Sequence, residues 1–168
     1  MRITSLAAPA ALASLALFVA SAWAADWTRT ESPTYGFAAD FPSKPKEESS
    51  VQQGVKMYSL ASGDRNLVCL VLRGEYPYVI NPDVELVASR DSFIKGMSAK
   101  LTATKRITFQ RGAKKLQALE FDAANDTHDM RSIIVIDGTY AYQVAGLVLK
   151  AGDSKNLERC VRGFALTE

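Results

Sequence analysis

The sequence predicts an α+β fold, a mostly antiparallel β-sheet with helices packed on it. Three observations indicate this class. Short apolar stretches separated by turn residues predict strands before and after one long helical segment. The helical segment opens with the start signal Asn81-Pro82-Asp83, and a second, shorter helical pattern lies near the C-terminus. Strands grouped on either side of a helix, rather than alternating with helices, are typical of α+β proteins.

The N-terminal half contains three predicted strands. Residues 35–41 form a short one that ends at Pro42, which cannot donate to a strand ladder. Residues 55–60 and 66–72 form a hairpin with Gly63 in its turn. Residues 67–72 are apolar without alternation, which predicts a strand buried on both faces. We expect coil over residues 25–34 and a solvated loop over residues 43–53.

The C-terminal half contains the two helices and four strands. Asn81 is the expected N-cap of a helix over residues 82–101. Residues 107–110 and 116–123 form a hairpin around Gly112, and residues 132–136 and 139–149 form one around Asp137-Gly138, which favours a type I′ turn. A last helix begins at residue 153 or 154. Its apolar stripe comprises Leu157, Cys160, Val161 and Phe164.

The first 24 residues predict a secretory signal peptide. Arg2 is followed by an apolar stretch over residues 6–22, and Ala22-Trp23-Ala24 predicts cleavage before Ala25. The alternative is a membrane anchor, but the most apolar block, residues 10–20, is too short to cross a core of about 30 Å. We therefore expect export to a bacterial periplasm, one globular domain over residues 25–168, and no transmembrane segment after cleavage.

Charge and cysteine content narrow the function classes. The chain has 20 Lys and Arg against 18 Asp and Glu, a balance that argues against a nucleic-acid partner. Its single histidine, His128, disfavours histidine-based catalysis and most zinc sites. Cys69 and Cys160 form an even pair, and an oxidising compartment favours a disulfide between them. The alternative is two buried free thiols.

Two segments are candidate partner surfaces. A basic run on the end of the long helix and the following hairpin could face an anionic partner such as a phospholipid surface or an acidic protein. Its members are Lys95, Lys100, Lys105, Arg106, Arg111, Lys114 and Lys115. The loop before the long helix forms a second candidate, with Tyr76, Tyr78 and Ile80 as its bulky residues. The alternatives are a solvated basic face and a loop that covers the edge of the core.

No catalytic residue, metal or cofactor is predicted. Ser92 and Lys95 have Ser-x-x-Lys spacing, but the other motifs of that active site are absent. One segment offers oxygen and nitrogen ligands, namely Asp122, Asn125, Asp126, His128 and Asp129. The same composition is typical of an ordinary turn between strands, which is the interpretation we favour.

Residues 32–45 resemble the opening of PsbP-like proteins, the family of the photosystem II extrinsic protein. Those chains often begin with a Tyr-Gly-Phe-x-x-x-Phe-Pro strand, which corresponds here to Tyr35 through Pro42. Those chains also end with a helix and a Phe-containing tail, and the predicted last helix followed by Phe164-Ala165-Leu166 is similar to that arrangement. The resemblance implies an α-β-α sandwich with a non-catalytic accessory or binding role. No binding residue is carried over, and nothing in the chain supports a photosystem role.

These observations leave three hypotheses for function. The first is an exported, non-enzymatic accessory protein that docks a protein or another envelope component. The second is a carrier of a small molecule or lipid, with an apolar pocket between sheet and helix. The third is a hydrolase of unrecognised type, which requires a polar cleft.

Overall fold

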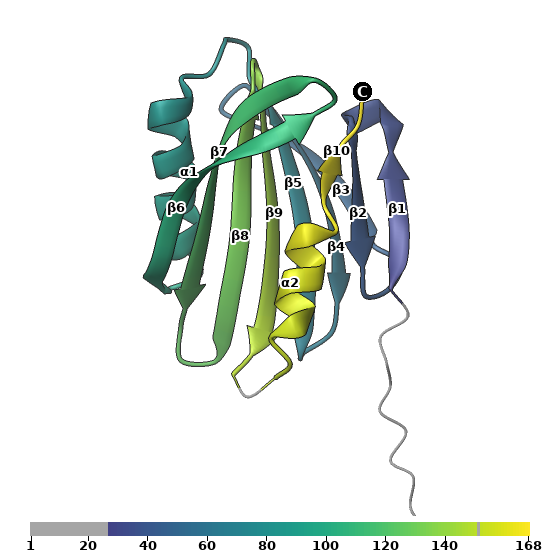
Figure 1. Cartoon of the computed structure of the whole chain (residues 1–168), viewed down its shortest axis with the longest axis vertical. Coiled ribbons are helices and arrows are strands. Elements are labelled where there is room, and N and C mark those ends of the chain that lie inside the picture. The colour runs from purple at the N-terminus through teal and green to yellow at the C-terminus, as the bar shows by residue number, and fades with distance from the viewer. Residues whose placement is uncertain (1–26, 151) are drawn as a thin grey trace, which may run out of the picture.

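Two antiparallel β-sheets and two α-helices make up residues 27–150 and 152–168, which the computed structural model describes (Figure 1). The predicted signal peptide lies outside the described residues. The large sheet has the strand order β3 (Lys46–Gln52), β4 (Val55–Gly63), β5 (Leu67–Glu75), β9 (Tyr140–Leu149), β8 (His128–Asp137), β7 (Lys114–Ala124) and β6 (Lys100–Arg111). The small sheet has the order β1 (Thr28–Ser32), β2 (Phe37–Phe41) and β10 (Ala165–Leu166). The helices are α1 (Pro82–Gly96) and α2 (Lys155–Arg162), and a single 3₁₀ turn spans Pro33–Tyr35.

The large sheet buries a hydrophobic core on each face. On one face, Leu86 of α1 packs with Leu119 and Phe121 of β7 and Ile134 of β8. On the opposite face, α2 and the small sheet form the cover, and Figure 1 shows α2 crossing in front of β9 with β1 and β2 beside it.

The predicted α+β class and α-β-α sandwich are wrong. The described chain holds ten strands in two sheets and only two α-helices, so the fold is β-rich. Much of one outer layer is the small sheet rather than helix. Its strand β1 covers residues expected to be coil, and β3 covers residues expected to be loop. Every residue of β3 is exposed, so this edge strand has no buried face and its sequence shows no alternation of apolar and polar residues.

Other local predictions are confirmed with shifted ends. Asn81 caps α1, its side-chain oxygen accepting from the backbone N–H of Asp83 at 3.0 Å. The helix ends at Gly96 rather than at residue 101, because Ser98 takes a positive φ of 49° and β6 begins at Lys100. Three members of the predicted stripe, Leu157, Cys160 and Val161, are buried on α2, and Phe164 is buried just beyond the end of the helix.

The type I′ turn lies at a different hairpin from the one predicted. Asp137 pairs with Tyr140, so the two loop residues are Gly138 and Thr139, and only Gly138 has a positive φ. This conformation excludes type I′, which needs a positive φ at both central positions. Gln53 and Gly54, between β3 and β4, do meet that requirement, with φ values of 50° and 83°.

Strand β5 is buried on only one face, contrary to prediction. Leu67, Cys69 and Val71 are buried under α2 and the small sheet, whereas Val68, Leu70 and Leu72 on the other face are half-buried. The cause is the position of α1, which packs on β7 and β8 rather than on β5. Apolar surface of β5 therefore stays accessible beside α1.

Candidate ligand-binding groove

A groove of about 510 Å³ runs between α1 and the large sheet. Its apolar wall comes from Val55 and Met57 of β4, Leu72 of β5, and Phe93 of α1, with Tyr76 at one end. All five side chains are half-buried. The volume lies within the range of small-molecule sites, which are concave and mainly apolar.

Small residues deepen the floor of this groove. A second cavity of about 60 Å³ lies against it and is lined by Gly74 and Ala141. A Cβ atom at Gly74 would stand 3.1 Å from Cε2 of Tyr76 and 3.5 Å from Sδ of Met57. The absence of a side chain at Gly74 therefore leaves room between β4 and Tyr76.

Half of the twelve residues that line the groove are polar, namely Gln52, Gln53, Glu85, Ser89, Ser92 and Gln143. Glu85 on α1 accepts hydrogen bonds at Oε1 from the hydroxyls of Tyr76 and Ser89, both at 2.8 Å. Burial and the neighbouring Glu85 carboxylate raise the pKa of Tyr76, so its hydroxyl stays protonated. Gln143 of β9 also lines the groove and donates to Ser132 at 3.0 Å. An apolar floor with a few oriented polar groups suits a small molecule that is apolar along most of its length.

The predicted loop patch divides into three environments. Ile80 is buried in the core, 5% exposed, and Tyr76 is half-buried at the groove. Tyr78 is 60% exposed and meets Tyr76 edge-on, with 5.6 Å between ring centroids. The three residues therefore do not form one surface, and only Tyr76 contributes to the groove.

The predicted basic run is not a uniform positive patch. Four of its seven members are in ion pairs, namely Lys105 with Glu120, Arg106 with Asp83, and Arg111 and Lys114 with Asp137. Lys105 and Arg106, adjacent on β6, reach partners on opposite faces of the large sheet. Three carboxylates, Glu120, Asp83 and Asp137, therefore offset only part of the positive charge of the run.

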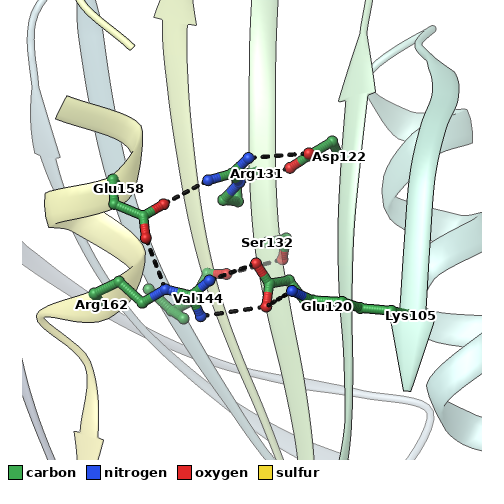
Figure 2. Close-up of polar contacts among 8 residues, drawn as sticks. All are labelled: Lys105, Glu120, Asp122, Arg131, Ser132, Val144, Glu158 and Arg162. Atoms are coloured by element: carbon green, nitrogen blue, oxygen red, sulfur yellow. Dashed lines mark hydrogen bonds and ion pairs between the residues drawn. The ribbon is translucent and has the colours of Figure 1, made fainter. Parts of the chain in front are cut away.

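A charged network on the other face joins α2 to the large sheet (Figure 2). Glu120, only 6% exposed, accepts from Arg162 at 2.7 and 3.2 Å and pairs with Lys105 at 3.3 Å. Arg131 donates to Asp122 and to Glu158, and Glu158 also accepts from Arg162 at 2.9 Å. Hydrogen bonds from Arg162 lower the pKa of Glu158, against a smaller opposing effect of burial. Each buried charge here has partners, so we assign the network a structural role.

The remaining candidates from the sequence are the polar segment around Asn125 and the Ser92/Lys95 pair. Asn125 accepts from the backbone N–H groups of Thr127 and His128, so the segment is the turn that we favoured. Within residues 27–150 and 152–168, no group of His, Cys, Asp and Glu side chains is arranged to hold a metal ion. Ser92 lies at the rim of the groove and Lys95 is exposed on α1.

The predicted disulfide between Cys69 and Cys160 is present. It joins β5 to α2 with the two Cα atoms 5.9 Å apart, a separation typical of disulfides. Both residues are 1% exposed, so the bond lies in the core between the large sheet and α2.

The sequence left most of the groove residues unassigned. One sequence feature pointed to the groove, namely the apolar run of residues 67–72. Because both faces of such a strand are apolar, other elements are expected to pack on both sides of the sheet. The sequence does not show that α1 would pack two strands away from β5, because that position depends on the order of strands in the sheet.

Compared with known proteins, the chain matches no family model and no curated protein. The resemblance to PsbP-like proteins stays a prediction from the sequence. None of the helices in the described part of the chain has the length and apolar character needed to cross a membrane.

Proposed function

We propose that this chain is an exported binding protein that carries a small, largely apolar molecule in the groove between α1 and the large sheet. The observation that carries the proposal is the half-buried apolar wall formed by Met57, Leu72 and Phe93, beside about 510 Å³ of accessible space. Covering this apolar surface with a ligand contributes about 25 cal/mol of favourable free energy for each Å² removed from water.

Export to the periplasm is part of the same proposal. It is supported by the signal-peptide pattern of residues 1–24 and by the Cys69–Cys160 disulfide, which suits an oxidising compartment. A periplasmic carrier would bind apolar molecules in the aqueous space between the two membranes and would need no catalytic residues. The accessory role implied by the PsbP-like resemblance has less support, because four of the seven cations of the basic run are in ion pairs and the loop patch is divided.

Blocking the groove tests the proposal. Ala88 is exposed on α1 and lines the groove, so A88W would fill it with an indole ring. The matched control is V84W, at a residue that is 63% exposed on the same helix and does not line the groove. The probe is N-phenyl-1-naphthylamine, an apolar dye that brightens in apolar surroundings, titrated into protein purified from the periplasm.

We expect saturable binding of one dye by the wild type and by V84W, and an affinity lower by at least about tenfold in A88W. Native mass spectrometry of the same samples would show any co-purified molecule in the wild type and its loss in A88W. Equal dye affinity in A88W and V84W, or no saturable binding by the wild type, would contradict the proposal.

A further inference from the structure

Arg73 is a buried cation with too few partners. It lies on β5, on the face opposite the groove, and its side chain is only 10% exposed. Its guanidinium carbon stands 4.2 Å from the ring centroid of Tyr140 and 5.4 Å from that of Tyr35. Aromatic faces attract a guanidinium but accept none of its in-plane N–H bonds.

Hydrogen-bond acceptors around Arg73 are scarce. Within the described residues, the guanidinium contacts one carboxylate, with Oε2 of Glu75 at 3.5 Å from Nη1. Its Nε is buried without a hydrogen-bond partner. A guanidinium has five N–H donors, and burying them unpaired is costly. The arginines of the charged network differ, since Arg131 and Arg162 are more exposed than Arg73 and each contacts two carboxylates.

A pocket of about 360 Å³ opens beside Arg73. Besides Arg73 itself, the residues that line it are Tyr35, Ser49, Ser50, Val51, Lys56, Met57, Tyr58 and Glu75, of which Met57 also lines the groove. Glu75 is shared, because its Oε1 lies 3.2 Å from Nζ of Lys56. Two cations therefore face one carboxylate, which leaves one positive charge among the residues that line the pocket.

The walls of the pocket are aromatic and apolar. The rings of Tyr35 and Tyr58 stack with centroids 3.5 Å apart, and Val51 is 71% exposed at the rim. Burial raises the pKa of Tyr58, with a smaller contribution from Glu47, so its hydroxyl is neutral. A flat apolar group can therefore lie against this wall while its charged end meets Arg73.

We propose that this pocket binds a small monocarboxylate with a planar apolar body. Its carboxylate would accept hydrogen bonds from the Arg73 guanidinium and approach the Lys56 ammonium. A single negative charge matches the single excess positive charge. A dianionic phosphate would carry twice the negative charge and meet stronger repulsion from Glu75, which is why the monocarboxylate is favoured.

The test is an NMR titration of the wild-type protein with benzoate, with benzamide as the neutral counterpart. We expect saturable shifts of amides on β3, β4 and β5 with benzoate at millimolar concentration or below, and none with benzamide. R73Q would abolish binding. K56Q would weaken it several-fold, whereas K46Q, an exposed lysine on β3 outside the pocket, would not change it.

The benzoate titration has outcomes that would contradict the proposed carboxylate site. Three results would overturn the proposal. The first is equal chemical-shift changes with benzoate and benzamide, and the second is benzoate binding that is unchanged in R73Q. The third is saturable binding of inorganic phosphate by a protein that does not bind benzoate. If R73Q does not fold, K56Q against K46Q decides, because both lysines are exposed. The site lies on the opposite face from the groove, so A88W should bind benzoate normally, and failure of one proposal leaves the other standing.

Discussion

Asp137, at the end of β8, ties together two segments that are far apart in the chain. It is 8% exposed, and its carboxylate accepts from Arg111 and from Nζ of Lys114 at 3.2 Å. Nε of Arg111 donates to the backbone carbonyl of Thr167 at 2.9 Å. Burial alone would raise the pKa of Asp137, but hydrogen bonds from Arg111 and Lys114 outweigh it and lower the pKa below 3.8. The carboxylate thus orients the arginine that holds the C-terminal segment.

The D137N variant should lose a pH-dependent part of the stability. A folded-state pKa below the unfolded value stabilises the protein above that value, and the stabilisation disappears as pH falls through the folded-state pKa. We expect the wild type to exceed D137N by about 1–3 kcal/mol in free energy of unfolding at pH 7. The difference should shrink as the pH falls below 3.8.

Urea denaturation at a series of pH values measures this difference. The control is D126N, which removes an exposed aspartate from the turn before β8. A gap between wild type and D137N that stays constant from pH 7 to strongly acidic solution would rule out the proposed ion pairing.

At the scale of elements, the β3–β4 hairpin forms one wall of both proposed sites. Val55 and Met57 of β4 line the groove, and Ser49 and Lys56 line the Arg73 pocket. The turn between the strands is Gln53-Gly54, with both residues at positive φ. Glycine tolerates this conformation, but glutamine is strained by it.

Replacing Gln53 with asparagine should therefore stabilise the hairpin. Asn-Gly is the preferred pair for a type I′ turn, and we expect Q53N to raise the free energy of unfolding by about 0.4–1 kcal/mol. Thermal denaturation followed by circular dichroism gives the measurement. Q52N, at the adjacent strand position, is the control and should give no gain; equal effects of the two changes would contradict the turn assignment.

At the scale of the whole molecule, the disulfide joins the two layers. Cys69 lies in the large sheet and Cys160 in α2, 91 positions apart in the sequence, with α1 and strands β6 to β9 between them. Gly146 on β9 permits the close approach of α2, because a Cβ there would stand 3.2 Å from Leu157 and 3.3 Å from Cβ of Cys160. The disulfide therefore fixes α2 on the large sheet and closes a loop that contains a large part of the chain.

Removing the disulfide should lower stability substantially. In the chain-entropy model a loop of this size contributes about 4–5 kcal/mol, and C69A/C160A should lose an amount of that order. Urea denaturation of the wild type with and without reductant gives a second value, and reductant should leave the double variant unchanged. A loss below about 1 kcal/mol in both experiments would show that the bond does not restrain the unfolded chain.

Local sequence patterns are enough to specify several features of this fold. Residues adjacent in the chain specify the Asn81 cap, the hairpin around Gly112, the buried stripe of α2 and most strand positions. These features depend on propensity and periodicity within a few residues. The prediction failed for β1 and β3, where strand formation depends on pairing with β2 and β4 rather than on an apolar pattern.

The second sheet and the two proposed sites depend instead on packing between distant parts of the chain. The groove exists because α1 packs on β7 and β8 and leaves β5 partly uncovered. The Arg73 pocket exists because Tyr35, Tyr58 and Arg73 come together from three separate segments. Such placements follow from strand order and layer packing, which join distant residues, and no local pattern in the chain encodes those distances.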